Sequence, residues 1–133
     1  MSLVTLHHVS IPVRDIDQAL VFYQAVLGLK QISRPNFPGK GAWLACGNGQ
    51  IHLALNPSGT FRAKRDISPI DIHFAMRVED FEATLQKFRS LGFSEEHPIG
   101  HAQKLFLDRK SIAGYPQVFL TDPDFNIIEV NSA

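Results

Sequence analysis

Four side chains in this sequence could act together in one chemical site, namely His8, His52, His73 and Glu129. Imidazole nitrogens and carboxylate oxygens are the atoms through which proteins bind zinc and related divalent ions. A single histidine in a strand is more often a hydrogen-bonded or exposed residue than a ligand, and a single glutamate is more often a surface carboxylate. The prediction of a metal site therefore depends on whether the four occupy equivalent positions of the fold.

His8 and His73 stand at the same place in an internal repeat. Shifted by 65 residues (73 minus 8), the segment that begins at His8 matches the segment that begins at His73. The matched pairs are Val13 with Val78, Asp15 with Asp80, Leu20 with Leu85 and Tyr23 with Phe88, and one deleted residue then brings Gly28 onto Gly92. Two copies are too few for a solenoid, so the repeat predicts a single domain of two similar halves, at about 4–56 and 71–131, with a linker at 57–70.

Each half is predicted to fold in the order strand, helix, strand, strand, strand. In the first half, alternating apolar residues predict a strand at 6–13. Asp15, with Gln18 three residues later, resembles a capping box at the start of a helix, and Gly28 ends that helix. The remaining elements are expected as strands at 29–34, 42–46 and 50–56, then a strand at 72–78, a helix carrying Phe81, Leu85, Phe88 and Leu91, and strands at 104–109, 117–121 and 127–131.

Strand parity brings the four candidate ligands to one side of the predicted sheets. Successive side chains of a strand point to opposite faces. The bulky faces, which the helices should cover, are Val9, Ile11 and Val13; Ile51, Leu53 and Leu55; Ile72, Phe74, Met76 and Val78; and Ile128 and Val130. The opposite faces carry the three histidines and Glu129, whereas His7 is expected on the helix side. The fold class is therefore α+β, with a curved, cup-like mixed sheet, helices on its outer face and a divalent metal site on its concave side.

Composition narrows the classes of partner. The 133 residues are 44% hydrophobic and 20% charged, with thirteen basic and thirteen acidic residues. This balance argues against nucleic acid or an anionic membrane as the main partner. The single cysteine, Cys46, excludes an internal disulfide and fits a reducing compartment. We find no secretory signal pattern and no apolar stretch of the roughly 20 residues that span a bilayer, so a cytoplasmic protein is expected.

Four segments of the chain resemble the vicinal oxygen chelate superfamily: LHHVSIPVRDIDQALVFYQAVLGL, IHLALN, IHFAMRVED and FLTDPDFNIIEV. This superfamily includes glyoxalase I, fosfomycin- and bleomycin-resistance proteins, extradiol dioxygenases and methylmalonyl-CoA epimerase. The resemblance implies the glyoxalase/bleomycin-resistance fold, in which paired βαβββ modules form a metal-holding cup. It also implies a homodimer, since in small members two chains commonly complete each site.

Carried over position by position, the resemblance implies that His8, His73 and Glu129 are metal ligands. The remaining ligand of glyoxalase I is a glutamate, and that position is His52 here. In the glyoxalase mechanism a metal-bound carboxylate moves a proton next to the substrate carbonyl. Glu129 is then the one remaining carboxylate base, while the metal, whether zinc, nickel, manganese or iron, stays open.

A second departure from the family is Phe125, which replaces the usual glycine of an Asp-Pro-Asp-Gly turn. Glycine at such a position supplies a positive φ. Phe125 therefore indicates strain, a shifted turn, or an aromatic side chain used against substrate or partner, and we favour the structural interpretation.

Six cationic residues are candidates for holding an anionic or thiol-conjugated substrate, such as a glutathione adduct or a phosphonate. They are Arg62, Lys64 and Arg65 in the linker, and Lys104, Arg109 and Lys110 in the second half. The alternative is that they belong to solvated loops.

Three functions are compatible with these residues. The first is a metal-dependent, glyoxalase-like lyase or isomerase acting on a small carbonyl compound. The second is a non-haem iron dioxygenase, since His8, His73 and Glu129 form a set of two histidines and one carboxylate. The third is a thiol transferase or drug-binding protein of the fosfomycin- or bleomycin-resistance type.

Overall fold

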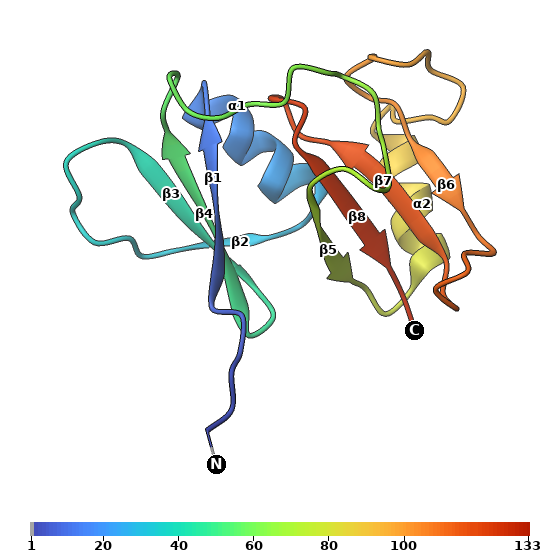
Figure 1. Ribbon diagram of the computed structural model, residues 1–133, viewed down its shortest axis with the longest axis horizontal. Coiled ribbons are helices and arrows are strands. Elements are labelled where there is room, and N and C mark those ends of the chain that lie inside the picture. The colour runs from blue at the N-terminus through green and yellow to red at the C-terminus, as the bar shows by residue number, and fades with distance from the viewer. Residues whose placement is uncertain (1) are drawn as a thin grey trace. The chain divides into compact units, whose positions relative to one another are not determined.

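The computed structural model describes residues 2–133 and divides into two compact units, Met1–Thr60 and Phe61–Ala133. Each unit contains one four-stranded mixed sheet and one helical segment (Figure 1). The strand orders are β1-β4-β3-β2 in the first unit and β5-β8-β7-β6 in the second, which is the same topology twice. The predicted α+β class and the paired βαβββ modules are therefore confirmed.

The first unit follows the predicted order with small changes in element bounds. Its elements are β1 (His8–Val13), α1 (Ile16–Val21), the π-helical turn η1 (Phe22–Val26), β2 (Lys30–Ile32), β3 (Gly41–Cys46) and β4 (Gly49–Leu55). Strand β1 pairs in parallel with β4, and β3 pairs antiparallel with both β4 and β2. Asp15 caps α1 through a 3.0 Å hydrogen bond from the backbone N–H of Gln18, as predicted. The strand expected at residues 29–34 is shorter in the structure, where β2 covers Lys30–Ile32.

The turn η1 accounts for the one-residue difference between the two repeats. The repeats are in register from Asp15 to Tyr23, and the first copy then has one residue more before its terminal glycine. A helix accommodates a single extra residue by widening one turn from an i→i+4 to an i→i+5 pattern. The π-helical turn lies at Phe22–Val26, where the extra residue occurs. The widening leaves Tyr23 fully buried, like its counterpart Phe88.

The second unit repeats the layout with an unbroken helix. Its elements are β5 (His73–Arg77), α2 (Phe81–Ser90), β6 (Phe106–Asp108), β7 (Gln117–Thr121) and β8 (Ile127–Asn131). Asp80 caps α2 as Asp15 caps α1, and Gly92 follows with a φ of +99°, as Gly28 does after η1 with +72°. The predicted strand at 104–109 is confined to β6 and an isolated bridge between Ser94 and Lys104.

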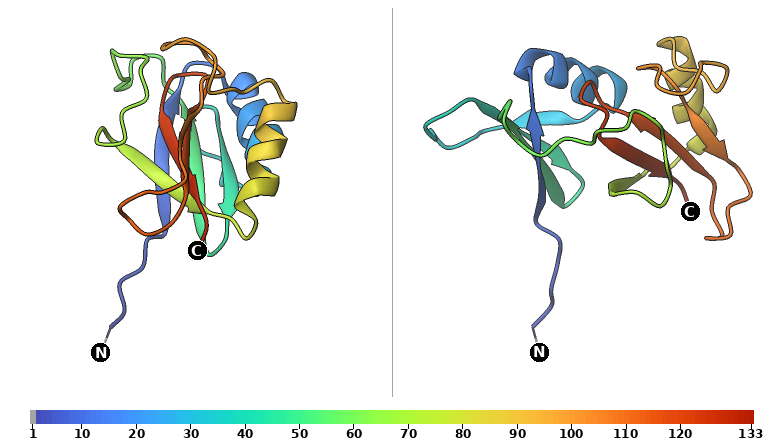
Figure 2. Two further views of the ribbon diagram at one scale, coloured as in Figure 1. Left: turned by 90° about the vertical axis from the view of Figure 1, so that its right-hand side faces the viewer. Right: turned by 45° about the horizontal axis from the view of Figure 1, so that its top comes forward.

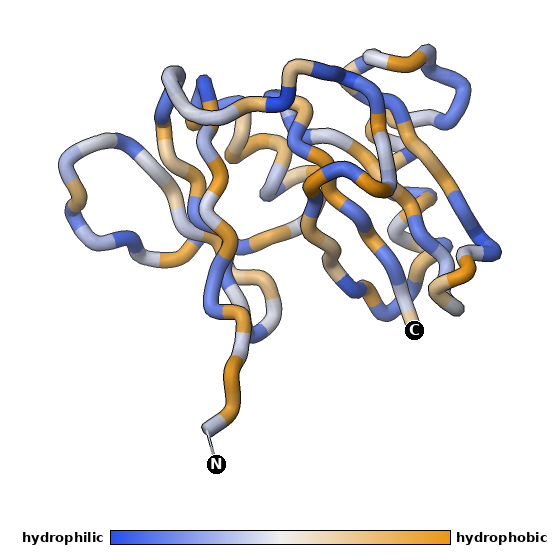
Figure 3. Tube along the Cα trace, viewed as in Figure 1, coloured by the Kyte–Doolittle hydropathy of each residue, from blue (hydrophilic) through white to orange (hydrophobic). Residues whose placement is uncertain are grey.

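In each unit the helical segment lies along one face of that unit's own sheet (Figure 2). Apolar residues alternate with more polar ones along β1, as the trace in Figure 3 shows, whereas β7 and β8 are buried along nearly their whole length. The side chains that parity assigned to the helix-covered faces are mostly buried: Ile11, Val13, Ile51, Leu53, Met76, Ile128 and Val130. Ile72 is an exception at 79% exposed, because β5 begins one residue later and Ile72 belongs to the preceding turn. Within residues 2–133, no helix is both long and apolar enough to cross a membrane.

Candidate metal centre

The first unit brings His8 and His52 together on one face of its sheet. His8 begins β1, and His52 lies in the middle of β4, opposite Ser10 of β1 and Trp43 of β3. The His52 ring stacks on the His8 ring at a centroid distance of 4.0 Å and on the Trp43 ring at 3.9 Å. The shared face predicted by parity is therefore present in this unit.

His52 is held in a form that leaves one ring nitrogen free. It is 8% exposed, and its Nε2 donates to the Gln50 Oε1 atom at 2.7 Å, because an amide oxygen can only accept. Burial is the largest cause that lowers the pKa of His52, and the positive charges of His8, His7 and Arg34 lower it further. The neutral ring therefore keeps a lone pair on Nδ1, the form of imidazole that binds metals.

His7 also belongs to this cluster, so the expectation that it points to the helix side is wrong. Its Nδ1 lies 2.9 Å from Nδ1 of His8, and its ring meets the His52 ring edge-on at 6.4 Å. Strand β1 begins at His8, so the alternation of a strand does not extend to His7.

The second unit brings His73 and Glu129 together in the same way. His73 begins β5, and Glu129 lies in the middle of β8, opposite Ala75 of β5 and Phe119 of β7. Nε2 of His73 is 3.3 Å from Oε1 of Glu129. Glu129 is only 5% exposed, and its other oxygen, Oε2, accepts a 2.6 Å hydrogen bond from Nδ2 of Asn131.

The hydrogen bonds of His73 leave its Nε2 suited to a cation. Nδ1 of His73 lies 2.8 Å from the backbone carbonyl of Asp71, and since a carbonyl only accepts, Nδ1 carries the proton. In the neutral ring, Nε2 of His73 then has a lone pair that faces Oε1 of Glu129. Two such acceptor atoms at 3.3 Å need a proton or a cation between them. Two ligands on a tetrahedral zinc, with bonds of about 2.05 Å, lie about 3.3 Å apart. The His73–Glu129 pair therefore fits a divalent ion, and the carbonyl bond to Nδ1 is the usual second contact of a metal-binding histidine.

The two pairs occupy matching positions of the repeat. His52 lies opposite Trp43 in the β3–β4 pairing, and Glu129 lies opposite Phe119 in the β7–β8 pairing. Phe119 meets the His73 ring edge-on at 5.6 Å, as Trp43 stacks on His52. Each unit therefore supplies one donor from its first strand, one from its last strand and one aromatic ring beside them. Phe119 did not enter the predicted site, although the parity of its strand against Glu129 would have indicated it.

Across residues 2–133, the structure gathers no group of three or more histidine, cysteine, aspartate or glutamate side chains that could hold a metal ion. It brings the four predicted residues together as two pairs, His8 with His52 and His73 with Glu129.

The family model of the glyoxalase/bleomycin resistance protein/dioxygenase superfamily matches residues 5–130, which include both units and all four candidate ligands. The chain belongs to this superfamily. The expected vicinal oxygen chelate resemblance is therefore confirmed.

Two curated relatives and one solved structure illustrate the similarity. "Glyoxylase I 4" of Arabidopsis thaliana is 31% identical over 134 residues, which cover 98% of this chain and 71% of that protein. "Glutathione transferase FosA" of Serratia marcescens is 27% identical over 106 residues, which cover 78% of this chain and 73% of that protein. The crystal structure of a glyoxalase family protein from Bacillus anthracis shares the fold at 20% identity, with a TM-score of 0.76 over 99% of this chain and 97% of that chain.

Phe125 adopts a backbone conformation with positive φ, which favours glycine. Its φ is +63°, the only positive value at a non-glycine residue among residues 2–133. The turn around it is fixed by Asp122, whose Oδ1 accepts the backbone N–H groups of Asp124 and Asn126 at 2.9 Å. The expected strain is thus present in an otherwise well-bonded turn, while the Arg65 guanidinium lies 4.7 Å from the Phe125 ring.

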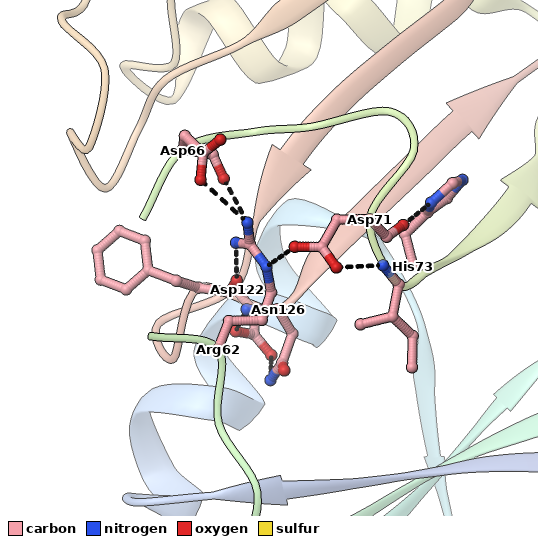
Figure 4. Close-up of polar contacts among 8 residues, drawn as sticks. Arg62, Asp66, Asp71, His73, Asp122 and Asn126 are labelled. Atoms are coloured by element: carbon pink, nitrogen blue, oxygen red, sulfur yellow. Dashed lines mark hydrogen bonds and ion pairs between the residues drawn. The ribbon is translucent and has the colours of Figure 1, made fainter. Parts of the chain in front are cut away.

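Of the cationic candidates for a substrate contact, Arg62, Lys104 and Arg109 have hydrogen-bond or ion-pair partners within the second unit. All three side-chain nitrogens of Arg62 donate hydrogen bonds to neighbouring residues (Figure 4). Lys104 donates to the Glu95 carbonyl at 2.6 Å, and Arg109 pairs with Glu82. These contacts favour a structural role for Arg62, Lys104 and Arg109. A substrate contact by Lys64, Arg65 or Lys110 stays a prediction.

Proposed function

We propose that this chain is a metal-dependent, glyoxalase-like lyase or isomerase in which His8, His52, His73 and Glu129 hold one divalent ion. The substrate is a small carbonyl compound, and a glutathione adduct is the form to test first. The observation that carries the proposal is the His73–Glu129 pair, in which Nε2 of His73 faces a carboxylate oxygen at 3.3 Å, the separation of two ligands on one divalent ion. The relative named glyoxylase I 4 supports the reaction class.

His8, His52, His73 and Glu129 would hold the divalent ion, which would supply Lewis acidity toward a carbonyl oxygen and so make the neighbouring C–H bond more acidic. Glu129 would accept that proton and return it to the former carbonyl carbon, while the proton of the neighbouring hydroxyl passes to the former carbonyl oxygen, so the reaction is an isomerisation that needs no external oxidant. The hydrogen bond from Asn131 fixes the Oε2 atom of Glu129, and burial keeps water away from the carboxylate. Both effects favour a carboxylate that stays oriented through the proton transfer.

His52 distinguishes this proposal from that of a two-carboxylate glyoxalase. A neutral imidazole in place of a carboxylate removes one negative charge from the ligand set, and it leaves Glu129 as the single carboxylate base. A single base must both remove the proton and return it, on one face of the substrate. The His52→Glu variant restores the two-carboxylate arrangement and is expected to turn over a glutathione–methylglyoxal hemithioacetal faster than the wild type.

The experiment that tests the proposal is turnover of that hemithioacetal by purified protein, before and after treatment with a chelator. Activity that is lost with the chelator and restored by divalent metal supports it, provided that the Glu129→Gln variant is inactive and the Glu96→Gln variant is not. Glu96 is a suitable control because it is a glutamate of the same unit that lies outside the candidate site. A folded, metal-loaded protein without activity in either the wild type or the His52→Glu variant would rule out the glyoxalase reaction.

A second candidate is a thiol transferase or drug-binding protein, favoured by the similarity to a protein named glutathione transferase FosA. The ligand set with one carboxylate is less negative than a two-carboxylate set and suits an anionic substrate better. Addition of glutathione to fosfomycin, followed by mass spectrometry, distinguishes this candidate from the first. Stabilisation by bleomycin without turnover would instead indicate a binding protein. The dioxygenase alternative predicts oxygen consumption with a catechol and Fe(II).

We also propose that the two repeat halves act as a single domain, that the protein is a cytoplasmic homodimer, and that neither nucleic acid nor membrane is its partner. The unpaired Cys46 supports a reducing compartment. Burial raises the pKa of the Cys46 thiol, which argues against a nucleophilic role. Light scattering coupled to size-exclusion chromatography tests the dimer.

A further inference from the structure

Arg62 lies in the linker segment and has a largely buried side chain, which is 8% exposed. Its Nε donates to Oδ2 of Asp71 at 3.0 Å and its Nη1 to the backbone carbonyl of Phe125 at 2.9 Å. Its Nη2 donates to the backbone carbonyl of Asp66 at 2.8 Å and to Oδ1 of the same residue at 3.3 Å. Figure 4 shows these acceptors arranged around one guanidinium. The planar fork of an arginine can serve three acceptors in different directions at once, which a lysine ammonium at the end of a flexible chain cannot do with the same geometry.

Two of the three acceptor residues lie just before the strands that carry His73 and Glu129. Asp71 precedes β5 by two residues, and Phe125 precedes β8 by two residues. These strands pair in parallel, with His73 opposite Ile127, so their starting ends lie side by side. Arg62 therefore connects the entrances of both strands.

Asp71 is itself bonded on both sides. Its Oδ1 accepts the backbone N–H of Ile72 at 2.7 Å, while Oδ2 accepts from Arg62. Its backbone carbonyl accepts Nδ1 of His73 at 2.8 Å. The Asp71 carbonyl decides which nitrogen of His73 carries the proton. Because Arg62 binds the side chain of the same aspartate, it also restrains the position of that carbonyl.

We propose that Arg62 is a positioning residue for the His73–Glu129 pair: it holds the Asp71 carbonyl against Nδ1 of His73 and the turn at Phe125 in register with it. This rests on the proposed function, since His73 and Glu129 are taken as metal ligands. Loss of the Arg62 bonds frees the Asp71 carbonyl, so His73 populates both tautomers and presents a protonated Nε2 to Glu129 part of the time. An ion then binds more weakly.

The test compares wild type with the Arg62→Lys and Asp71→Ala variants, and uses Arg89→Lys as the matched control. Asp71→Ala keeps the backbone carbonyl but removes the two side-chain contacts. Arg89 is an arginine of the same unit that lies in α2 and pairs with Glu95, outside β5 and β8. Nitrogen-15 NMR of labelled histidine distinguishes a protonated from an unprotonated ring nitrogen and so reports the tautomer of His73 in the metal-free protein. Titration with Co²⁺ reports the ion affinity.

In the wild type, His73 is expected in the single tautomer with Nδ1 protonated. In Arg62→Lys and Asp71→Ala, its signals should move toward a mixture, and Co²⁺ binding should weaken roughly tenfold, the lower end for contacts behind a metal ligand. Arg89→Lys should match the wild type in both measurements. The proposal is overturned if Arg62→Lys keeps the wild-type tautomer and a Co²⁺ affinity within about twofold of wild type. If Arg62→Lys does not fold, the same criterion applies to Asp71→Ala.

The two measurements separate this proposal from the proposed function. A wild-type protein that binds no Co²⁺ while its His73 tautomer still depends on Arg62 would refute the metal site and leave the positioning role intact. A protein that binds Co²⁺ with a tautomer indifferent to Arg62 would refute the positioning role alone.

Discussion

Replacing Glu129 with glutamine is expected to stabilise the metal-free protein at about pH 8, although it removes the proposed base. Nδ1 of His73 carries the proton that bonds the Asp71 carbonyl, so in the neutral ring Nε2 is an acceptor and faces a second acceptor, Oε1 of Glu129, at 3.3 Å. In the variant, the glutamine carbonyl can keep the hydrogen bond from Asn131, and the amide nitrogen takes the place of Oε1. It then donates a hydrogen bond to Nε2 of His73.

The size of this effect follows from three contributions. The new hydrogen bond to His73 adds about 1 kcal/mol, and the bond from Asn131 loses about 1 kcal/mol because its acceptor is no longer charged. These two changes cancel. The sign is decided by the carboxylate of Glu129, which is 5% exposed: burying an ion costs several kcal/mol, and the nearest cationic side chain among its contacts, Arg77, reaches it only through Asn131. After allowance for partial screening, we expect a net gain of about 1–2 kcal/mol in the free energy of unfolding.

Urea unfolding at about pH 8 with a chelator present measures this gain, and the Glu96→Gln variant, which changes a glutamate outside the site, is the control. A repeat with Co²⁺ at about 100 times its dissociation constant should stabilise the wild type by about 2.7 kcal/mol and the Glu129→Gln variant by less. A Glu129→Gln variant that unfolds at a lower urea concentration than the metal-free wild type would refute the reasoning. The Glu129 carboxylate would then already be stabilised in the metal-free protein by a proton or another partner.

Two further predictions concern the core and the pH dependence. Leu85→Ala should lower the free energy of unfolding by about 2–5 kcal/mol in a denaturant titration, because Leu85 is fully buried in α2. Gln86→Ala, at the neighbouring exposed position, should change it by under about 0.5 kcal/mol. An equal loss in both variants would contradict the packing of Leu85. The lowered pKa of His52 means that, as the pH falls below the ordinary histidine value of 6.5, the unfolded chain takes up a proton before the folded chain does. The metal-free protein should therefore keep this contribution to the free energy of unfolding above that pH and lose it as the pH falls toward the pKa of His52 in the folded protein. The His52→Gln variant should show a weaker dependence of unfolding on pH. A pH profile that the substitution leaves unchanged would contradict the burial of a neutral His52.

The repeat and the alternation of strands were sufficient to predict the βαβββ order and the faces of His8, His52, His73 and Glu129. Side chains alternate with a period of two in any strand, so parity holds wherever the bounds of the strand are right. It failed for His7 and Ile72, which lie one residue outside β1 and β5.

Other features depend on contacts that no local pattern encodes. Arg62 binds the Phe125 carbonyl 63 residues away, so its sequence neighbours suggested a substrate contact or a solvated loop and gave no sign of this structural role. The tautomer of His73 depends on a backbone carbonyl and was equally out of reach. The π-helical turn had one sign in the sequence, the single-residue offset between Gly28 and Gly92, but an offset does not show whether a helix or a loop accommodates the extra residue.

The central claim is that His73 and Glu129, with His8 and His52, hold one divalent ion, and metal analysis of the native protein tests it most directly. The protein should contain about one divalent ion per chain after purification without chelator, or after loading and dialysis. That content should fall in the His73→Gln and Glu129→Gln variants and persist in Glu96→Gln. A fully folded wild type that takes up no divalent ion, or one that binds it equally well without His73 and Glu129, would contradict the claim.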